Sequence, residues 1–435
     1  MNEYKNLQRI ISDYFKDKTK EDLEKEIFFD SPELFYEIAK YRNFGMPKRY
    51  TNAVKKSSVD HKLFFFESNL AKQYTGNPRY IYERMLERYP NFKYVWSYNG
   101  DKDMIPGNPI VVERGSNEYY KYLAKACVLI NNTTFPIWFH RKESFYLQTW
   151  HGTPYKQMHW DIQVKELQTR STPHFYVKSR GWDALLSPNH FSTEKFSSGF
   201  RYDGNILEYG YPANDIFYDK EKYQAKRAEI RNLLNIEDDA LVYLYAPTWR
   251  DGGHIGNSMF KFDLMLNPTE FLEHAPEDSI LLIRSHHMSE STEALKGLEG
   301  RAIDVSGFDD AIEIMCASDV LITDYSSIVF DWYCSKKPVL YFVPDLDKYV
   351  NTLRGTYFDI EEVNCGPVCK TNEELYENLD VKDAKFYKDF YEEFCSLHDG
   401  KSADKVIDFI VDLNKESFKG KMDKNLRKGY KKIFS

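Results

Sequence analysis

Short apolar runs that end in polar residues recur along this chain of 435 residues. The clearest is Phe-Tyr-Leu-Gln-Thr-Trp at 145–150, which leads into His151-Gly-Thr-Pro154. A β-type run broken by Gly, then Thr and a Pro suited to the first helical position, predicts a strand-to-helix junction with His151 at the carboxyl end of the strand. Ligands bind at that end of the strands in open parallel sheets. This pattern restricts the chain to α/β folds in which several junctions share one cleft.

The same pattern occurs in five further segments: Leu63–Ser68, Ile206–Pro212, Leu241–Arg250, Ile280–His287 and Val320–Ser327. Helical spacing between many of the apolar runs gives a βαβ rhythm, and the length exceeds what one hydrophobic core usually holds. We therefore predict two Rossmann-like, doubly wound domains around a cleft. Their boundaries are predicted as a helical lead-in at 1–60, domains at 61–215 and 216–400, and a C-terminal helix with a basic tail at 401–435.

Composition favours a folded protein, with 42% hydrophobic and 29% charged residues. The six cysteines are scattered and the first residues show no apolar segment with a cleavage site, so we expect a reducing cytoplasm. Cys365 and Cys369 have no second Cys or His pair nearby, which favours ordinary thiols over a zinc site. No stretch approaches the ~20 apolar residues of a bilayer span, so any membrane contact is expected to be peripheral.

The last segment, 415–435, differs in charge from the rest of the chain. It carries eight Lys or Arg against Glu416 and Asp423, a net charge of +6 in a chain whose total is -8. Apolar residues recur among these cations every three or four positions, as in an interfacial helix on anionic lipid. The alternative is a terminal helix that packs across both domains and leaves a solvated basic face.

Two serines follow the buried run that begins at Val320. Ser326 and Ser327 can open a helix over Ile328–Cys334, so that their hydroxyls and backbone N–H groups face a helix N-terminus, which favours an anion such as phosphate. Ser and Asp are also ordinary capping residues, so a plain N-cap is the equal alternative.

Two other junctions carry guanidinium groups. Arg284 offers a planar fork for phosphate oxygens, and His286 beside it can donate a proton. Thr248 and Arg250 follow another strand, with Trp249 between them that we expect in the core. For any single junction of this kind, a surface arginine with a satisfied histidine is the commoner case.

His151 has the widest range of chemical roles, because a neutral imidazole near pH 7 can accept a proton from an attacking hydroxyl. A lone histidine is usually structural, but Gly152, Thr153 and Lys156 surround this one with groups suited to a polar site. HExxH, GxGxxG and P-loop motifs are missing, so no metal or cofactor is required, although Mg²⁺ is possible.

Together these motifs resemble the CDP-glycerol glycerophosphotransferases of teichoic-acid and capsule synthesis. The resemblance extends from Phe66 to Lys401, and the order of the motifs also matches: Gln148–Lys156, Ser187–Phe191, Gly210–Asp215, Ala246–Arg250, Ile283–His286, Thr323–Ser327 and Arg354-Gly355. It implies a GT-B architecture, with an acceptor-side first domain and a CDP-donor-binding second domain. The implied reaction transfers glycerol phosphate from a CDP-linked donor to an acceptor hydroxyl and releases CMP.

The resemblance also assigns roles to residues. It implies that His151 is the base that activates the acceptor hydroxyl and that His286 supports the donor phosphates or the leaving CMP. The diphosphate and nucleotide would be held by Arg250, Arg284, Asp324, Ser326, Ser327 and Thr248. The further site candidates are Gly152, Thr153, Lys156, Asn189 and Arg354.

The resemblance implies three partners: a CDP-glycerol or CDP-ribitol donor, a lipid-linked or polymeric polyol-phosphate or saccharide acceptor, and an anionic membrane surface contacted by 415–435. Nucleic acid is not expected, and the implied location is peripheral, on the inner face of the cell membrane. Alternatives remain open at this point: a ribitolphosphotransferase, a GT-B glycosyltransferase that uses a nucleotide sugar, or a non-catalytic nucleotide-binding protein.

Overall fold

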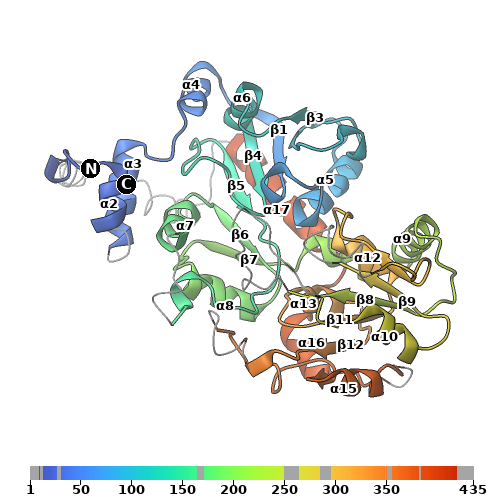
Figure 1. Cartoon of the computed structure of the whole chain (residues 1–435). Helices are drawn as coiled ribbons and strands as arrows, with labels where there is room; N and C mark the ends of the chain where they lie inside the picture. The colour runs from blue at the N-terminus through green and yellow to red at the C-terminus, as the bar shows by residue number, and fades with distance from the viewer. Residues whose placement is uncertain are drawn as a thin grey trace.

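The computed structural model describes residues 9, 13–26, 31–163, 171–248, 264–284, 295–347, 349, 355–381 and 384–418. Within them the chain forms two parallel sheets, each covered by helices (Figure 1). The predicted fold class is confirmed, because this is the two-domain, GT-B-like α/β architecture that the strand pattern indicates. All six cysteines are buried free thiols.

The first sheet has seven strands in the order β3-β2-β1-β4-β5-β6-β7. Side chains of β1 alternate between the two faces: Phe64 and Phe66 pack into one core, and Leu63 and Phe65 into the other. The strands are β1 (Asp60–Glu67), β2 (Lys93–Ser97), β3 (Ile110–Val112), β4 (Ala126–Asn131), β5 (Phe145–Gln148), β6 (Ala184–Ser187) and β7 (Asn205–Glu208).

The second sheet has six strands in the order β10-β9-β8-β11-β12-β13, again all parallel. The order reverses between β8 and β11, and in such folds ligands bind at the carboxyl ends of the strands at that reversal. The strands are β8 (Val242–Ala246), β9 (Ile280–Ile283), β10 (Ala302–Asp304), β11 (Val320–Thr323), β12 (Val339–Phe342) and β13 (Val368–Cys369).

Helices connect and cover both sheets. The first sheet carries α5 (Gly76–Arg88), α6 (Asn117–Lys125), α7 (Ser171–Ser179) and α8 (His190–Gly199), with the 3₁₀ turns η1 (Asn69–Ala71), η2 (Lys102–Met104) and η3 (His159–Asp161). The turn η5 (Pro212–Tyr218) leads to the second sheet, which carries α9 (Lys220–Leu233), α10 (Pro268–His274), α12 (Ala311–Ala317), α13 (Ile328–Tyr333), α15 (Asn372–Glu377) and α16 (Lys388–Phe394).

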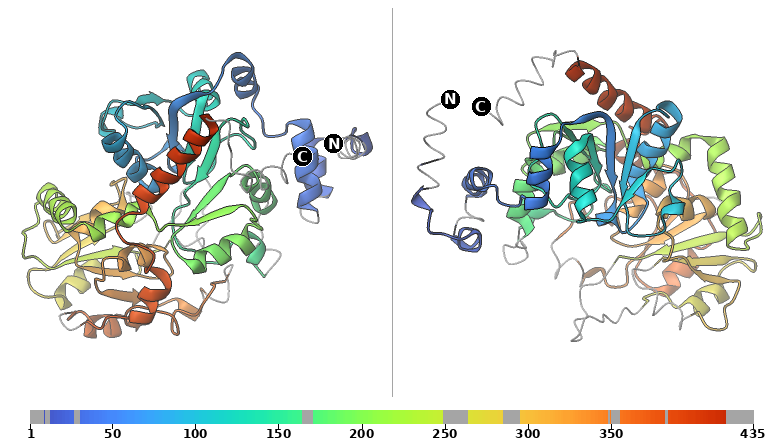
Figure 2. Two further views of the ribbon diagram at one scale, coloured as in Figure 1. Left: turned by 180° about the vertical axis from the view of Figure 1, so that it is seen from behind. Right: turned by 90° about the horizontal axis from the view of Figure 1, so that it is seen from above.

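The last described helix, α17 (Ser402–Phe418), returns to the first sheet. Figure 2 shows it lying across the back of that sheet, and its Val406, Ile407 and Ile410 are buried in the same core as Phe64 and Phe66. The chain therefore crosses twice between the two domains. The basic segment 419–435 lies outside the described residues.

The predicted helical lead-in consists of α2 (Lys20–Glu26), α3 (Pro32–Arg42) and α4 (Lys48–Lys56). The first two pack against Trp138 and α7 through Leu23, Phe35 and Ile38. The lead-in thus forms part of the wall around the first domain. Among the described residues, no helix has the length and apolar character needed to cross a bilayer.

The helix predicted after Pro154 is wrong. Residues 152–158 run as a loop along the second domain, where Gln157 N donates to Gly355 O at 3.0 Å and Tyr357 N donates to Tyr155 O at 3.0 Å. The Tyr155 side chain is buried in the core of the second domain. These contacts with the other domain replace the backbone bonds that a helix would have made.

Candidate active site

A cavity of about 360 Å³ lies between the two domains. The first domain contributes His151, and the second contributes Arg284, Ser326 and Ser327. We call this cavity the interdomain crevice. It brings the predicted imidazole and the predicted anion-binding groups to one place, at the carboxyl ends of strands from both sheets.

The backbone before His151 is strained. Trp150 has φ of 51°, a left-handed conformation that is rare for an aromatic residue, and its N–H donates to Gln148 Oε1 at 2.9 Å. Its ring stacks on the imidazole of His151 with centroids 4.4 Å apart. Strain of this kind is typical of functional sites, and here it fixes the direction in which His151 leaves the strand.

His151 keeps an exposed edge toward the crevice, while the protein around the ring removes water from the charged form and lowers the pKa of His151 below its ordinary value. The imidazole is consequently neutral near pH 7 and has a lone pair for a proton. This is the protonation state that a general base needs.

Gly152 lets the two domains meet beside His151. A Cβ atom at this position would lie 3.0 Å from Ser327 Oγ, a tight contact that the serine side chain would have to relieve by moving a few tenths of an ångström. The Gly152 carbonyl also accepts a hydrogen bond from the buried Tyr211 hydroxyl at 3.3 Å. The small residue therefore allows the His151 loop to approach the serines of the second domain.

Ser326 and Ser327 begin α13, as predicted, but Ser327 does not act as a plain N-cap. Its side chain makes no capping hydrogen bond, and Ser326 Oγ accepts only a long one, 3.4 Å from Ile328 N. Both residues line the crevice. Their hydroxyls are therefore available to a ligand rather than used up by the helix.

One nitrogen of the Arg284 guanidinium binds the backbone, and the residue also lines the crevice. Nη1 donates to Val305 O at 3.1 Å and to Phe308 O at 2.9 Å, which fixes the loop before α12. Burial lowers the pKa of Arg284, with Asp310 and Asp309 opposing the shift, but an arginine stays charged in a protein. The other nitrogens of the fork remain for phosphate oxygens.

Several predicted residues lie around a second hollow of about 310 Å³ that shares His151, Ser326 and Ser327 with the crevice. The lining includes Gly152, Thr153, Lys156 and Thr248. Lys156 Nζ lies 5.4 Å from the centroid of the Tyr349 ring. These residues extend the site along the loop that crosses to the second domain.

Two predicted residues support the site from behind. Asp324 is buried and its two oxygens accept from Thr248 N at 2.8 and 3.0 Å, which joins the ends of β8 and β11. Asn189 is also buried, caps α8 through Ser192 N, and donates to Thr153 Oγ1 at 3.0 Å. Arg250, His286 and Arg354 lie outside the described residues.

Comparison with known proteins agrees with this geometry. The family model of CDP-glycerol:poly(glycerophosphate) glycerophosphotransferases matches residues 49–412. The chain belongs to this family.

Two curated relatives are named teichoic acid poly(glycerol phosphate) polymerase. The one from Staphylococcus epidermidis is 38% identical over 82% of this chain and 51% of its own length, and the one from Bacillus subtilis is 36% identical over 86% and 52%. The chain thus spans about half the length of these relatives. A structure of the wall teichoic acid polymerase TagF, a histidine variant soaked with CDPG, has a TM-score of 0.79 and 34% identity, covering 89% of this chain and 98% of that one.

Sequence reasoning missed many of the polar residues that line the crevice in this glycerophosphotransferase-family chain, including the carboxylates of Asp309 and Asp310. Asn69 and Asn132 line it from the connections after β1 and β4, Asn77 lines it from the start of α5, and Asp331 lines it from α13. Burial raises the pKa of Asp331 to about 7, although Asn214 Nδ2 donates to it at 2.8 Å. The Asn131-Asn132 pair was the signal that could have been followed, because polar residues at the end of a buried strand mark the same kind of junction as His151 after β5.

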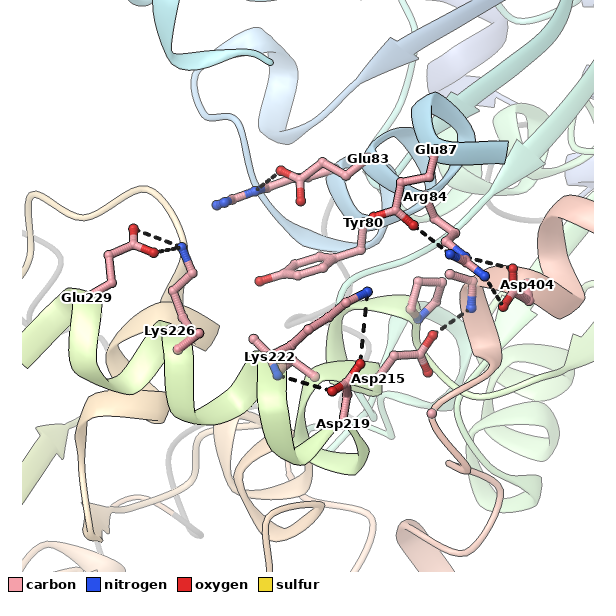
Figure 3. A pocket seen from close by; sticks show the side chains of 16 residues that line it. Tyr80, Glu83, Arg84, Glu87, Asp215, Asp219, Lys222, Lys226, Glu229 and Asp404 are labelled. Atoms are coloured by element: carbon pink, nitrogen blue, oxygen red, sulfur yellow. Dashed lines mark hydrogen bonds and ion pairs between the residues drawn. The ribbon is translucent and has the colours of Figure 1, made fainter. Parts of the chain in front are cut away.

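A larger cavity of about 510 Å³ lies between α5, α9 and α17 (Figure 3). Its cations are already paired: Arg79 with Glu83, Asp310 and Glu313, Arg84 with Glu87 and Asp404, and Lys226 with Glu229 and Glu313. We call it the salt-bridged cavity. In the part of the chain described, no group of three His, Cys, Asp or Glu side chains is placed to hold a metal ion.

Proposed function

We propose that this protein transfers glycerol phosphate from CDP-glycerol to a hydroxyl of a lipid-linked or polymeric polyol-phosphate acceptor and releases CMP. The observation that carries the proposal is the shared lining of the interdomain crevice by His151 from one domain and Arg284, Ser326 and Ser327 from the other. Membership of the glycerophosphotransferase family and the names of the relatives support the same donor.

His151 acts as the general base. The acceptor hydroxyl gives its proton to the neutral imidazole as its oxygen attacks the phosphorus of the glycerol phosphate group. The bond from that phosphorus to the bridging oxygen breaks, and the oxygen leaves as part of CMP. A pKa below the ordinary histidine value keeps the imidazole of His151 unprotonated before the proton transfer. It also makes the imidazole a slightly weaker base.

The second domain holds the charge of the donor. Attack on a diphosphate requires positive charge and N–H or O–H donors around oxygens that gain charge, more than it requires covalent help. Arg284 supplies a cation, and the two serines supply hydroxyls at the N-terminus of α13. His286 and Arg250, which lie outside the described residues, are proposed to join them, and Asp324 is proposed to hold the Thr248 loop in place.

The identity of the donor substrate that supports transfer distinguishes this proposal from its alternatives. Radiolabelled CDP-glycerol, CDP-ribitol and UDP-sugars are incubated in turn with the protein and a teichoic-acid-type acceptor, and label in the acceptor is counted together with CMP release. Transfer from CDP-glycerol supports the proposal. Transfer from CDP-ribitol alone would favour a ribitolphosphotransferase, and transfer from a UDP-sugar would favour a glycosyltransferase. Nucleotide binding without transfer would indicate an inactive cleft.

We further propose that residues 61–215, together with α17, form the acceptor side and residues 216–400 the donor side. The position of His151 in the first and of Arg284 in the second supports this division. Segment 415–435, with its net charge of +6, is proposed to bind the anionic inner face of the cell membrane. Deleting it should weaken binding to anionic vesicles, and unchanged binding would contradict this role.

A further inference from the structure

A further cavity, of about 630 Å³, lies on the first domain between the lead-in and α7. We call it the basic cavity. Among the described residues that line it, three are charged and all three are cations: Lys20 from α2, Arg114 after β3 and Lys178 from α7. Its volume is in the range of ~300–1,000 Å³ typical of ligand sites.

The cations of the basic cavity are held close together. Burial lowers the pKa of Lys178, and the nearby positive charges of Arg114 and Lys20 lower it further. Within the described part of the chain, no carboxylate pairs with the Lys178 ammonium. In this respect Lys178 differs from the cations of the salt-bridged cavity, each of which has at least one carboxylate partner.

The other two cations are fixed by the fold. Arg114 Nη2 donates to Thr134 O at 2.9 Å, and its Nε lies 3.7 Å from Oε1 of Glu67, which is buried behind the cavity. Lys20 Nζ lies 5.1 Å from the centroid of the Trp138 ring. Gly45 also belongs to this wall, because a Cβ there would lie 2.3 Å from the Trp138 ring. Three separate parts of the chain therefore build one cationic hollow.

Two loops separate the basic cavity from the interdomain crevice. Asn69 and Asn132 face the crevice, whereas the neighbouring Leu70 and Thr134 face the basic cavity. The loops are joined by a hydrogen bond from Asn69 N to Asn132 Oδ1 at 2.9 Å. The two cavities thus lie on opposite sides of one wall.

The wall itself is strained. Asn69, Leu70 and Ala71 have φ values of 45°, 59° and 67°, so three successive residues other than glycine adopt the left-handed conformation. L-residues disfavour this conformation, and such segments cluster at ligand sites. The turn leaves the Leu70 side chain 41% exposed beside the basic cavity.

Helix α7 provides a second link between the two cavities. Phe175 packs edge-on against Trp150, the residue before His151, with ring centroids 5.7 Å apart. Lys178 lies three positions later, on the same side of the helix. The residue that would bind the anion is therefore positioned by the helix that also supports the proposed base.

We propose that the basic cavity binds a phosphate group of the acceptor. This contact would hold the acceptor molecule so that its terminal hydroxyl reaches His151. This inference rests on the proposed function and adds a second subsite to it. The phosphate can belong to a preceding polyol-phosphate unit or to the diphosphate of a lipid carrier. Lys178 and Arg114 are the groups that pair with this phosphate, and the acceptor molecule passes over the turn at 69–71.

The test uses Lys178→Met, which keeps the apolar stem and removes the charge. We expect the acceptor KM to rise about tenfold, the size of one lost charge-assisted hydrogen bond, with kcat and the KM for CDP-glycerol unchanged. Lys178→Arg should restore the acceptor KM. Lys102→Met is the matched control, because it removes an exposed lysine of the same domain that lines none of the four cavities described above.

Two acceptors distinguish the sources of the phosphate. A higher KM for a soluble oligo(glycerol phosphate) places the phosphate in the polymer, and a higher KM only for a lipid-diphosphate-linked acceptor places it in the carrier. An unchanged KM for both acceptors overturns the proposal. So does weaker binding of Lys178→Met to anionic vesicles with an unchanged KM for the soluble oligomer, because the ligand would then be a membrane lipid.

A binding measurement keeps this inference separate from the proposed activity. Fluorescently labelled oligo(glycerol phosphate), without donor, should bind wild type and His151→Ala equally and bind Lys178→Met about tenfold more weakly. Equal binding by all three proteins contradicts the subsite. If wild type binds the oligomer through Lys178 but releases no CMP from CDP-glycerol, the subsite stands and the proposed reaction fails. The thermal midpoint of Lys178→Met should not fall, since no partner loses a bond.

Discussion

The interdomain crevice and the salt-bridged cavity both lie along α5 and use their charges in opposite ways. Gly76 and Asn77 at the start of α5 face the crevice, and the next two turns, from Arg79 on, face the salt-bridged cavity. The salt-bridged cavity is the larger, about 510 Å³ against 360 Å³, and the richer in charge. Its cations, however, already have carboxylate partners, whereas the fork of Arg284 and the two serines keep donors for a ligand.

This difference shows that volume and charge alone do not identify a site. From the salt-bridged cavity, Arg79 of α5 binds Asp310, the N-cap of α12 that lines the crevice, and Glu313 within α12, so these charges join the two domains. In the crevice, the backbone is strained at Trp150, and Ser327 approaches position 152 so closely that a Cβ there would make a tight contact. Stability is expected to depend on the first region and turnover on the second.

His151→Ala should produce the largest change. Removing the general base is expected to lower kcat at least about 100-fold, with the KM for CDP-glycerol little changed, because Arg284 and the serines remain. CMP release under saturating donor measures the effect. His190→Ala is the control, since that histidine is exposed on α8 and hydrogen-bonds only surface Glu208. Near-normal turnover of His151→Ala would remove the imidazole from the mechanism.

The Arg79→Met variant should instead be less stable than the wild type. The variant leaves the buried Asp310 carboxylate without its cation, and breaking such a pair lowers the free energy of unfolding by about 3 kcal/mol or more. Urea denaturation measures the loss. The double variant Arg79→Met/Asp310→Asn should recover part of it, because the uncompensated charge is gone. A kcat loss near that of His151→Ala under folding conditions would contradict the separation of the two regions.

The sequence alone was enough for the sheets and for part of the crevice. Buried strands such as β8 and β11 read as continuous apolar runs because both faces are covered, and a parallel sheet brings their carboxyl ends together. Gathering Arg284 and Ser326 in one place follows from that rule, whereas His151 follows a strand of the other sheet and meets them where the two domains face each other. The helix predicted after Pro154 failed because contacts with the second domain, such as Gln157 with Gly355, hold the segment extended.

Other features depend on contacts between segments far apart in the chain. The left-handed turn at 69–71 contains no glycine, so no local signal marks it, and Asn132 on the neighbouring strand connection stabilises it. The basic cavity needs the lead-in, a strand end and α7 together. Asp324 was predicted near phosphate, but it binds Thr248 N across the strand ends, a choice that composition cannot reveal.

The pH dependence of kcat/KM should distinguish His151 from Asp331, two of the titratable groups that line the crevice. Because burial lowers the pKa of His151, the base is lost only on acidification below its ordinary value of about 6.5, and the rate should fall there as the ring is protonated. Burial raises the pKa of Asp331 to about 7, so Asp331→Asn is the control. If that variant abolishes the acid limb, Asp331 and not His151 is the group that titrates.

The smallest effect is expected for Arg84→Met, at the rim of the salt-bridged cavity. Arg84 Nε and Nη2 bind the two oxygens of Asp404 at 2.9 and 3.0 Å, but its side chain is 37% exposed and Arg88 also holds Asp404, at 2.8 Å. An exposed ion pair contributes about 0–1 kcal/mol, and salt screens it further. The variant should therefore lose at most about 1 kcal/mol of unfolding free energy, with a smaller loss at high salt and an unchanged kcat. Slower CMP release in a stably folded Arg84→Met protein would show that this cavity takes part in the reaction and that pairing among its charges does not exclude a ligand.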